Sequence, residues 1–173
     1  MSGLGHDHEV SPEAGTGTRA AAGAAAEAVL AYGRRVLASQ PFSVLIGAEL
    51  HALAPGHAEI QLPLSAQLKQ QNGFAHGGIV SYMADNALTF AGGTALRVPV
   101  VTAEFKINYV RPALGERLVA RARAVHTGSS QAVCTCEVFV VNDGVEKLCA
   151  LAQGTIAKLP DSPKKQDDRR DTP

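Results

Sequence analysis

The sequence has no net charge and none of the long apolar runs from which membrane proteins are built. Its 16 basic and 16 acidic residues give a formal net charge of zero, so it lacks the positive excess that draws proteins to nucleic-acid phosphates. No apolar run approaches the roughly 20 residues that span a bilayer. The first residues, with His6-Asp7-His8-Glu9, do not resemble a basic and then apolar leader. These absences predict a soluble, cytoplasmic protein with no nucleic-acid or membrane partner.

Cysteine is also scarce, and the sequence patterns of a metal site or a serine hydrolase are missing. The chain contains only Cys134, Cys136 and Cys149, which cannot all pair and show no C-x-x-C or zinc-like spacing. Free cysteine behaves as a small buried hydrophobe in a reducing compartment, so reduced core thiols are expected. No serine lies in a G-x-S-x-G context, which disfavours an α/β-hydrolase type of esterase. We expect no metal ion and no cofactor, and a hydrolase of this sequence would have to use water or a carboxylate.

The chain does contain enough apolar material for one folded domain. Apolar residues make up 46% of its 173 residues and charged residues 18%, which supports a core and argues against disorder in the middle. The length suits one domain with loose ends. Residues 1–19 and 160–173 lack apolar periodicity, so we expect disordered tails there and a single domain over residues 20–159.

The order of hydrophobic patterns predicts an α+β domain. An alanine-rich packing or lid helix is expected over about residues 20–39 and a second helix over about 77–91, where Gly92-Gly93 would end it. Turn signals separate β-rich runs; the predicted strands are 45–52, 57–64, 100–110, 117–126, 131–141 and 146–158. A hairpin, a long helix and four antiparallel strands describe a curved sheet packed on the helix.

The run 100–110 alternates most regularly and predicts a half-buried strand. Side chains of alternate residues point to opposite faces of a strand. One face would carry Val101, Ala103, Phe105, Ile107 and Tyr109, and the other Thr102, Glu104, Lys106 and Asn108.

The start of the second predicted helix carries the residues with chemical potential. The backbone amides of Gly77 and Gly78 at the helix N-terminus could stabilise a negative oxygen that develops on a carbonyl under attack. Ser81, Asp85 and Thr89 share one face at i, i+4 spacing. The apolar stripe of the same helix consists of Ile79, Met83, Ala87 and Phe90. Asp85 is thus displayed away from the core side, where a carboxylate in a narrow cleft could act as general base or nucleophile.

The spacing of Gly77 and Asp85 predicts an oligomer. Eight residues of helix separate them by roughly 12 Å, at about 1.5 Å per residue, whereas both would need to lie within about 3 to 4 Å of one reacting carbon. Two antiparallel helices related by a two-fold axis could place Gly77 of one protomer near Asp85 of the other. We therefore expect a homodimer, or a dimer of such dimers.

With His76-Gly77-Gly78, Asp85 and then the run 108–113, Asn-Tyr-Val-Arg-Pro-Ala, residues 44–158 resemble the phenylacetyl-CoA-type hotdog thioesterases. The resemblance implies a hotdog fold, a curved antiparallel sheet wrapped around a central helix. It further implies that the Gly77 amide polarises the thioester carbonyl, that His76 helps to position that end of the site, and that Asp85 activates water or attacks directly. Thr102 matches a position where the family often has a hydroxyl near the attacking water.

The resemblance also suggests which residues would contact the substrate. The family commonly has an asparagine six residues before the histidine; this chain has Gln70 there, so Gln70, Gln71 and Asn72 all stay candidates for orienting substrate or water. Gly78 and Asn108 are further candidates. Arg111 and Arg117 are candidates for contacts to the phosphates of CoA, with exposed positions at a turn as the alternative.

The expected function is hydrolysis of acyl-CoA, with a medium-chain or aromatic acyl group suggested by small and apolar helix residues near Asp85. Two alternatives stay open. A hotdog hydratase or dehydratase would share the fold and the thioester ligand but add or remove water across a double bond. A non-catalytic acyl-CoA sensor would use the same cleft, although the sequence shows no helix-turn-helix pattern with a basic face to accompany it.

Overall fold

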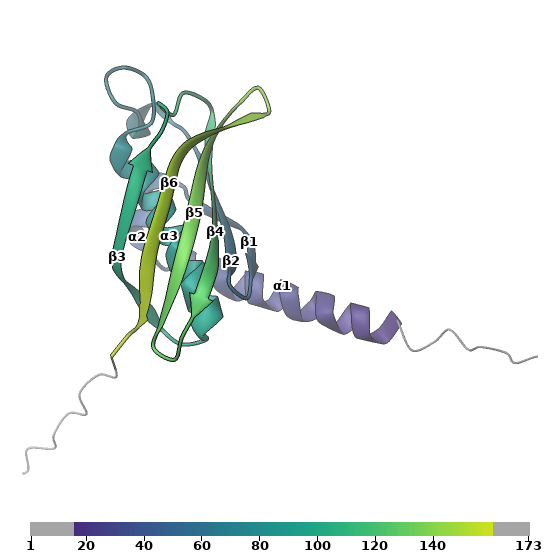
Figure 1. Ribbon diagram of the computed structural model, residues 1–173. Coiled ribbons are helices and arrows are strands. Elements are labelled where there is room, and N and C mark those ends of the chain that lie inside the picture. The colour runs from purple at the N-terminus through teal and green to yellow at the C-terminus, as the bar shows by residue number, and fades with distance from the viewer. Residues whose placement is uncertain (1–15, 161–173) are drawn as a thin grey trace, which may run out of the picture.

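The computed structural model describes residues 16–160, and in these the chain forms an antiparallel sheet wrapped around one long helix (Figure 1). The elements in order are α1 Thr16–Ala38, α2 Pro41–Ile46, β1 Glu49–Ala54, β2 His57–Pro63, η1 Ala66–Leu68, α3 Gly77–Leu96, β3 Val100–Tyr109, β4 Arg117–Thr127, β5 Gln131–Asn142 and β6 Val145–Lys158. The six strands lie in the order β1-β2-β4-β5-β6-β3. The predicted α+β hotdog architecture is confirmed. The tails at 1–15 and 161–173 lie outside the described residues.

Helix α3 packs closely against the sheet because its buried face includes three alanines and one glycine beside larger residues. Met83, Ala84, Ala87, Leu88 and Ala91 are fully buried. A Cβ atom added to Gly92 would lie 2.6 Å from the Cβ of Ile156 on β6. Between two neighbouring strands, a Cβ atom added to Gly154 of β6 would lie 2.7 Å from the Cβ of Phe105 on β3. These positions admit only glycine unless the neighbouring strand moves.

That packing explains why the expected end of α3 at Gly92-Gly93 was wrong. The helix continues to Leu96 and is capped by Arg97, whose φ of 58° is left-handed. A mid-helix glycine costs roughly 1 kcal/mol relative to alanine, but here Gly92 allows the close contact with Ile156. Burial against the sheet therefore outweighs the local preference to stop.

The N-terminal elements also differ from the predicted boundaries. Helix α1 begins at Thr16 instead of residue 20, and Figure 1 shows it reaching away from the body of the domain. Pro41 begins a second, short helix, as proline at a first helical position can. Gly47, with a φ of 77°, ends that helix, so the first strand starts at Glu49 instead of residue 45.

A β-bulge in β3 corrects the predicted alternation of side chains. The register against β6 shifts between Thr102 and Glu104, which leaves Ala103 as the extra residue. Thr102 consequently faces α3 on the same side as Phe105, which packs on the core, while Val101 is exposed on the opposite side. A regular period of two could not reveal this change of phase.

The three cysteines lie in the core as free thiols, which confirms the predicted packing role. Cys134, Cys136 and Cys149 are buried. Burial raises the pKa of Cys134 and Cys149 to about 11 and that of Cys136 to about 12. The thiolate, which is the reactive form, is therefore scarce at neutral pH. Within residues 16–160, no helix combines the length and the apolar character needed to cross a membrane.

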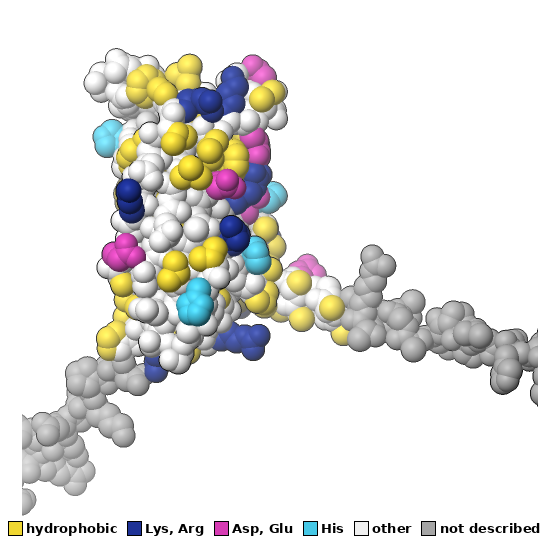
Figure 2. Space-filling view, in the orientation of Figure 1, with side chains coloured by type: hydrophobic (Ala, Val, Ile, Leu, Met, Phe, Trp, Pro, Cys, Tyr) yellow, Lys and Arg dark blue, Asp and Glu magenta, His cyan; other side chains and the backbone are white. Residues whose placement is uncertain are grey.

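The face of the sheet opposite α3 carries both charged and apolar side chains. Figure 2 shows basic, acidic and histidine side chains scattered over it among hydrophobic ones. Arg121 of β4 is held there by Glu59 at 2.7 Å and by Glu146 at 2.6 Å. We refer to this surface as the outer face and to the side covered by α3 as the helix side.

Candidate active site

Asp85 lies in the middle of α3 and is tied to the bulged strand by a short hydrogen bond. The Thr102 hydroxyl donates to Asp85 Oδ1 at 2.7 Å. Thr89, one turn further along α3, lies 2.9 Å from Thr102 between hydroxyl oxygens, and its hydroxyl is also 2.9 Å from the Asp85 carbonyl oxygen. The structure thus brings together the predicted carboxylate and the predicted hydroxyl from elements 17 positions apart.

The number of protons available fixes the direction of the hydrogen bond between Thr102 and Asp85. An ionised carboxylate only accepts hydrogen bonds, so the single proton of the Thr102 hydroxyl goes to Asp85. Any hydrogen bond between the two hydroxyls must then use the proton of Thr89. Thr89 has one proton, which it can donate either to Thr102 or to the Asp85 carbonyl oxygen, each 2.9 Å away. Within residues 16–160, no second donor to the Asp85 carboxylate is found, so Oδ2 is left for a water molecule or substrate.

His76 caps the N-terminus of α3. Its ring Nδ1 accepts a hydrogen bond from the Gly78 amide at 3.0 Å, and its own amide donates to the Leu68 carbonyl at 2.9 Å. Because Nδ1 is the acceptor, the proton of a neutral ring resides on Nε2. The predicted positioning role of His76 fits this geometry.

The cap engages only one of the two glycine amides that were both expected to stabilise negative charge. The Gly78 amide is engaged by His76, so it stabilises the cap. For the Gly77 amide, no acceptor is found anywhere in residues 16–160. This amide lies in the first turn of a 20-residue helix, where the positive end of the helix dipole favours negative charge. Of the two amides, only that of Gly77 is left unpaired in the described residues.

Tyr109 is a neighbour of Gly77 that the sequence alone did not identify. Its hydroxyl donates to the Gly77 carbonyl at 3.0 Å, and its ring lies 3.7 Å from the position that a Cβ on Gly77 would occupy. The tyrosine is the last residue of β3, where the strand passes the start of α3. Its place at the end of an alternating strand was a signal for burial, yet the side chain is 54% exposed and lies beside the helix mouth.

A cleft of about 360 Å³ opens at this end of α3 and collects several of the predicted substrate contacts. It is lined by Gln70, Gly77, Tyr109 and Arg111 together with Phe74, Ala75, Val80, Val110, Pro112 and Ala113. The Arg111 guanidinium donates to the Leu148 carbonyl at 2.8 Å, so its direction is fixed while it stays exposed.

Two of the predicted substrate contacts lie outside this cleft. Gln71 and Asn72 lie in an exposed turn and do not line the cleft. Asn72 instead donates to the Gln70 side-chain oxygen at 3.3 Å. Gln70 is therefore the one of the three amide side chains that reaches the cleft.

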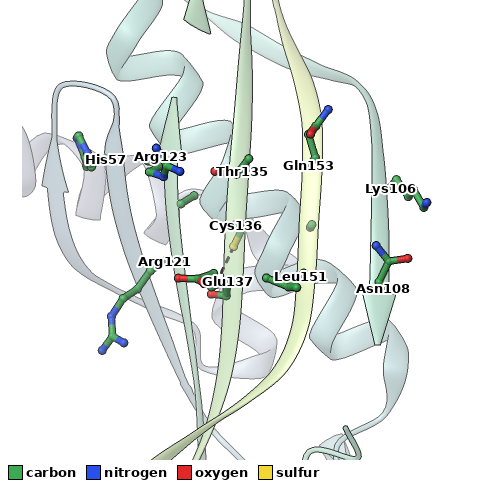
Figure 3. A pocket seen from close by; sticks show the side chains of 12 residues that line it. His57, Lys106, Asn108, Arg121, Arg123, Thr135, Cys136, Glu137, Leu151 and Gln153 are labelled. Atoms are coloured by element: carbon green, nitrogen blue, oxygen red, sulfur yellow. Dashed lines mark hydrogen bonds between the residues drawn. The ribbon is translucent and has the colours of Figure 1, made fainter. Parts of the chain in front are cut away.

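Asn108 and Arg117 lie away from both the cleft at Gly77 and the hydroxyl cluster at Asp85. Asn108 points from β3 into a hollow of about 630 Å³ on the outer face, beside Lys106 and across the sheet from His57 (Figure 3). Arg117 begins β4 and lines neither the cleft nor this hollow. Lys106 and Arg123 contribute positive charge to the hollow, but neither Asp85 nor Gly77 lines it.

A polar network on the other flank of Asp85 was also not foreseen. The Tyr82 hydroxyl donates to Ser43 of α2 at 2.6 Å, and the Ser43 hydroxyl donates to the Gln40 side-chain oxygen at 2.6 Å. Asn86 donates to the same oxygen at 3.3 Å. Burial raises the pKa of Tyr82, and the negative charge of Asp85 adds to the effect.

Comparison with known proteins identifies the family. Residues 72–147 match the model of the thioesterase superfamily. The 1,4-dihydroxy-2-naphthoyl-CoA hydrolase of Escherichia coli is 31% identical over 103 residues, which cover 58% of this chain and 74% of that protein.

Solved structures give the same result. A thioesterase family protein from Silicibacter pomeroyi superposes with a TM-score of 0.68 at 37% identity, over 72% of this chain and 93% of that one. A variant of the phenylacetic acid degradation protein PaaI from Thermus thermophilus superposes with a TM-score of 0.61 at 36% identity, over 69% of this chain and all of that one. The chain therefore belongs to the thioesterase superfamily, among the PaaI-like proteins of the hotdog fold, and is a thioester hydrolase.

Proposed function

We propose that the protein hydrolyses acyl-CoA thioesters to the free acid and CoA, with Asp85 as the catalytic carboxylate and the Gly77 amide as the oxyanion donor. The observation that carries the proposal is that both groups have hydrogen-bonding capacity that the described chain does not use. Asp85 is held by Thr102 through one oxygen only, and the Gly77 amide is unpaired within the described chain. A carboxylate and an oxyanion donor are the two functions that thioester hydrolysis requires.

In the proposed reaction, water bound at Asp85 Oδ2 attacks the thioester carbon and gives its proton to the carboxylate. The carbonyl oxygen becomes an oxyanion that the Gly77 amide stabilises. Collapse of this intermediate breaks the carbon–sulfur bond, and the proton on Asp85 neutralises the leaving thiolate. Thr102 holds Oδ1 throughout, so the second oxygen keeps its direction toward the water.

Direct attack by Asp85 on the same carbon is the alternative route, which forms an anhydride that water then opens. A single turnover in H₂¹⁸O distinguishes the two. Attack by water places ¹⁸O in the released acid, whereas opening of an anhydride at the Asp85 carbon leaves ¹⁸O in the protein.

The two groups would come from different protomers. The eight residues between Gly77 and Asp85 lie in one uninterrupted helix, so about 12 Å separates them along its axis. A two-fold axis between antiparallel α3 helices would bring Gly77 of one chain to Asp85 of the other and create two equivalent sites. We infer a homodimer as the smallest active unit, with a dimer of dimers as its extension.

The substrate class follows from the surroundings of the site. In this proposal Arg111, which is exposed at the rim of the cleft and donates to a carbonyl of β6, binds a phosphate of CoA. The similarity to a 1,4-dihydroxy-2-naphthoyl-CoA hydrolase supports an aromatic acyl group, and medium-chain groups are the other candidates. A cytoplasmic location fits the three unpaired thiols.

Thiol release from a panel of acetyl-, butanoyl-, octanoyl-, benzoyl- and phenylacetyl-CoA tests the activity. We expect free CoA to appear with at least one medium-chain or aromatic substrate and to vanish in Asp85→Asn, while binding persists. Addition of water to an enoyl-CoA without thiol release would point instead to a hydratase. Tight binding without any reaction would point to a sensor.

Mixing two inactive variants tests the shared site. Gly77→Pro removes the amide at a first helical position, which tolerates proline. No hydrogen bond is lost within the described residues, and the preceding His76 already has the extended ψ of 136° that proline requires. A mixed dimer of Gly77→Pro with Asp85→Asn contains one intact site if the site is shared. Random mixing should then restore about one quarter of wild-type activity. No recovery in a mixture whose exchange is verified by mass spectrometry would place the whole site within one protomer.

A further inference from the structure

Helix α2 presents large apolar side chains to solvent directly beside the flank of Asp85. Phe42 is 51% exposed and Leu45 80% exposed. They are three residues apart, so they lie on one side of the helix. The Phe42 ring meets the Tyr82 ring edge-on, with centroids 5.2 Å apart. Tyr82 belongs to the turn of α3 just before Asp85.

Exposed apolar residues on a six-residue helix would ordinarily suggest a loosely held segment, but α2 is firmly attached. Ser43 is only 1% exposed, and its hydroxyl both accepts from Tyr82 and donates to Gln40 at 2.6 Å. Asn86, which follows Asp85, completes the chain to Gln40. Every hydroxyl proton in this network has one acceptor, which is the condition under which a buried polar network stabilises a single arrangement.

The polar groups on the two sides of Asp85 are therefore used differently. On the β3 side the hydroxyls of Thr89 and Thr102 lie at the carboxylate. On the α2 side the polar groups are bonded to one another, and the ring of Phe42 packs edge-on against that of Tyr82, so this side presents exposed apolar surface. An acyl group whose carbonyl carbon sits at Asp85 could bury apolar surface there, and such burial is the main source of affinity for an alkyl or aryl group.

We infer that Phe42, Leu45 and the ring of Tyr82 form the wall that receives the acyl group and sets its preferred size. We call these three residues the acyl wall. The chain Asn86–Gln40–Ser43–Tyr82 holds the acyl wall in place, so Ser43 and Gln40 are positioning residues. This inference rests on the proposed role of Asp85, because the wall is located relative to the carbonyl carbon attacked there.

The test compares a long and a short substrate in matched variants. We measure kcat/KM for octanoyl-CoA and butanoyl-CoA in wild type, Phe42→Ala and Leu45→Ala. The control is Val145→Ala, which truncates another exposed apolar residue on the β5–β6 hairpin. Phe42→Ala should lower the octanoyl value about tenfold, mainly through KM, and change the butanoyl value by less than about twofold. Leu45→Ala should give a smaller change with the same preference, and the control should give none.

Tyr82→Phe tests the positioning network without removing the ring. The variant loses the donor to Ser43, so α2 should become less well held, and the ratio of octanoyl to butanoyl kcat/KM should fall about threefold. An equal loss for both substrates in Phe42→Ala and Tyr82→Phe would overturn the inference. A change of sedimentation coefficient in Phe42→Ala would also overturn it, because α2 would then be a subunit contact.

Binding of unreactive ligands separates this inference from the proposed function. S-octyl-CoA and S-butyl-CoA are thioethers that cannot be hydrolysed, and calorimetry gives their affinities in wild type and Phe42→Ala. If no acyl-CoA is hydrolysed but Phe42→Ala loses about tenfold for the octyl thioether alone, the acyl wall stands and the catalytic proposal fails. If hydrolysis proceeds and Phe42→Ala leaves both affinities unchanged, the acyl wall fails and the catalytic proposal stands.

Discussion

The helix side and the outer face of the sheet offer opposite combinations of space and chemistry. The outer face has the larger hollow, about 630 Å³, and more charged side chains, whereas the cleft at the start of α3 measures about 360 Å³. Yet Arg121 on the outer face is already neutralised by Glu59 and Glu146. On the helix side, the Gly77 amide and one Asp85 oxygen have no partner in the described chain. Unused hydrogen-bonding capacity, more than volume or charge, marks where chemistry can occur.

The largest expected effect is the loss of Asp85. Asp85→Asn keeps the size of the side chain and removes the carboxylate, so kcat should fall about 1,000-fold while the affinity for S-octyl-CoA changes little. Thiol-release kinetics and calorimetry measure the two quantities. The matched control is Glu104→Gln, which removes a charge from an exposed β3 residue that bonds to Thr155. Near-normal kcat in Asp85→Asn would break the assignment of chemistry to the helix side.

Removal of the Gly77 amide should have the next largest effect. Gly77→Pro should lower kcat about 100-fold, because one oxyanion donor is lost at an otherwise tolerant position. Gly77→Ala retains the amide, and its Cβ would meet Tyr109 at an ordinary 3.7 Å. This control should therefore stay close to wild type in the same assay. Equal losses in both variants would assign the defect to packing against Tyr109 instead of to the amide.

Thr102 should act by positioning Asp85. Thr102→Val removes the hydroxyl but keeps a branched side chain, so Asp85 Oδ1 loses its donor and kcat should fall about tenfold with little change in KM. Thr102→Ser restores the hydroxyl and should recover most of the activity. A full loss in the serine variant would show that the methyl group, and hence packing of the bulge, is what matters at this position.

A substitution at Asn108 tests whether the outer face of the sheet takes part in substrate binding. The resemblance to the family made it a substrate-binding candidate, but its side chain points into the outer hollow. Asn108→Ala should therefore change kcat/KM by less than about twofold for every acyl-CoA tested. A selective rise in KM would mean that the CoA moiety extends around the edge strand to the outer face.

The smallest expected effect concerns stability. The hydrogen bond from Arg121 lowers the pKa of Glu146; for Glu59 the effect of burial is opposite, but the bonds from Arg121 and Gln61 outweigh it and lower that pKa too. Because both pKa values are lowered on folding, their stabilisation is present above the ordinary value of 4.5 and is lost as the pH falls below it. Arg121 and Glu146 are partly exposed, so Arg121→Gln should cost only about 0.5 to 1 kcal/mol at pH 7.

Urea unfolding at pH 7 and at pH 3.5 measures this effect. The difference between wild type and Arg121→Gln should shrink at the lower pH, and thiol release at pH 7 should stay unchanged. A difference that grows on acidification would contradict the assigned direction of the pKa shifts.

The long helix could be predicted because the information is local. The His-Gly-Gly start and the position of Asp85 two turns later follow from helical periodicity within residues 76–90. The apolar stripe was predicted in part: Met83 and Ala87 are buried, whereas Ile79 and Phe90 are only partly buried, and Val80, Ala84 and Leu88 complete the buried face. The four strands after α3 were also predicted to within a few residues, since clear turn signals separate them. The separation of Gly77 and Asp85 likewise needed only the rise of a helix.

The contacts that complete the site depended on residues distant in sequence. Thr102 reaches Asp85 only because a bulge reverses the phase of β3, and a period-two pattern contains no sign of an extra residue. Tyr109 and Gly77 are 32 positions apart, and Tyr82 and Ser43 are 39 apart. Helix geometry is set by neighbours within one turn, whereas hydrogen bonds across a sheet depend on register, which the whole core determines. Periodicity therefore located the helix that carries Asp85, and the packed sheet determined the partners of its side chains.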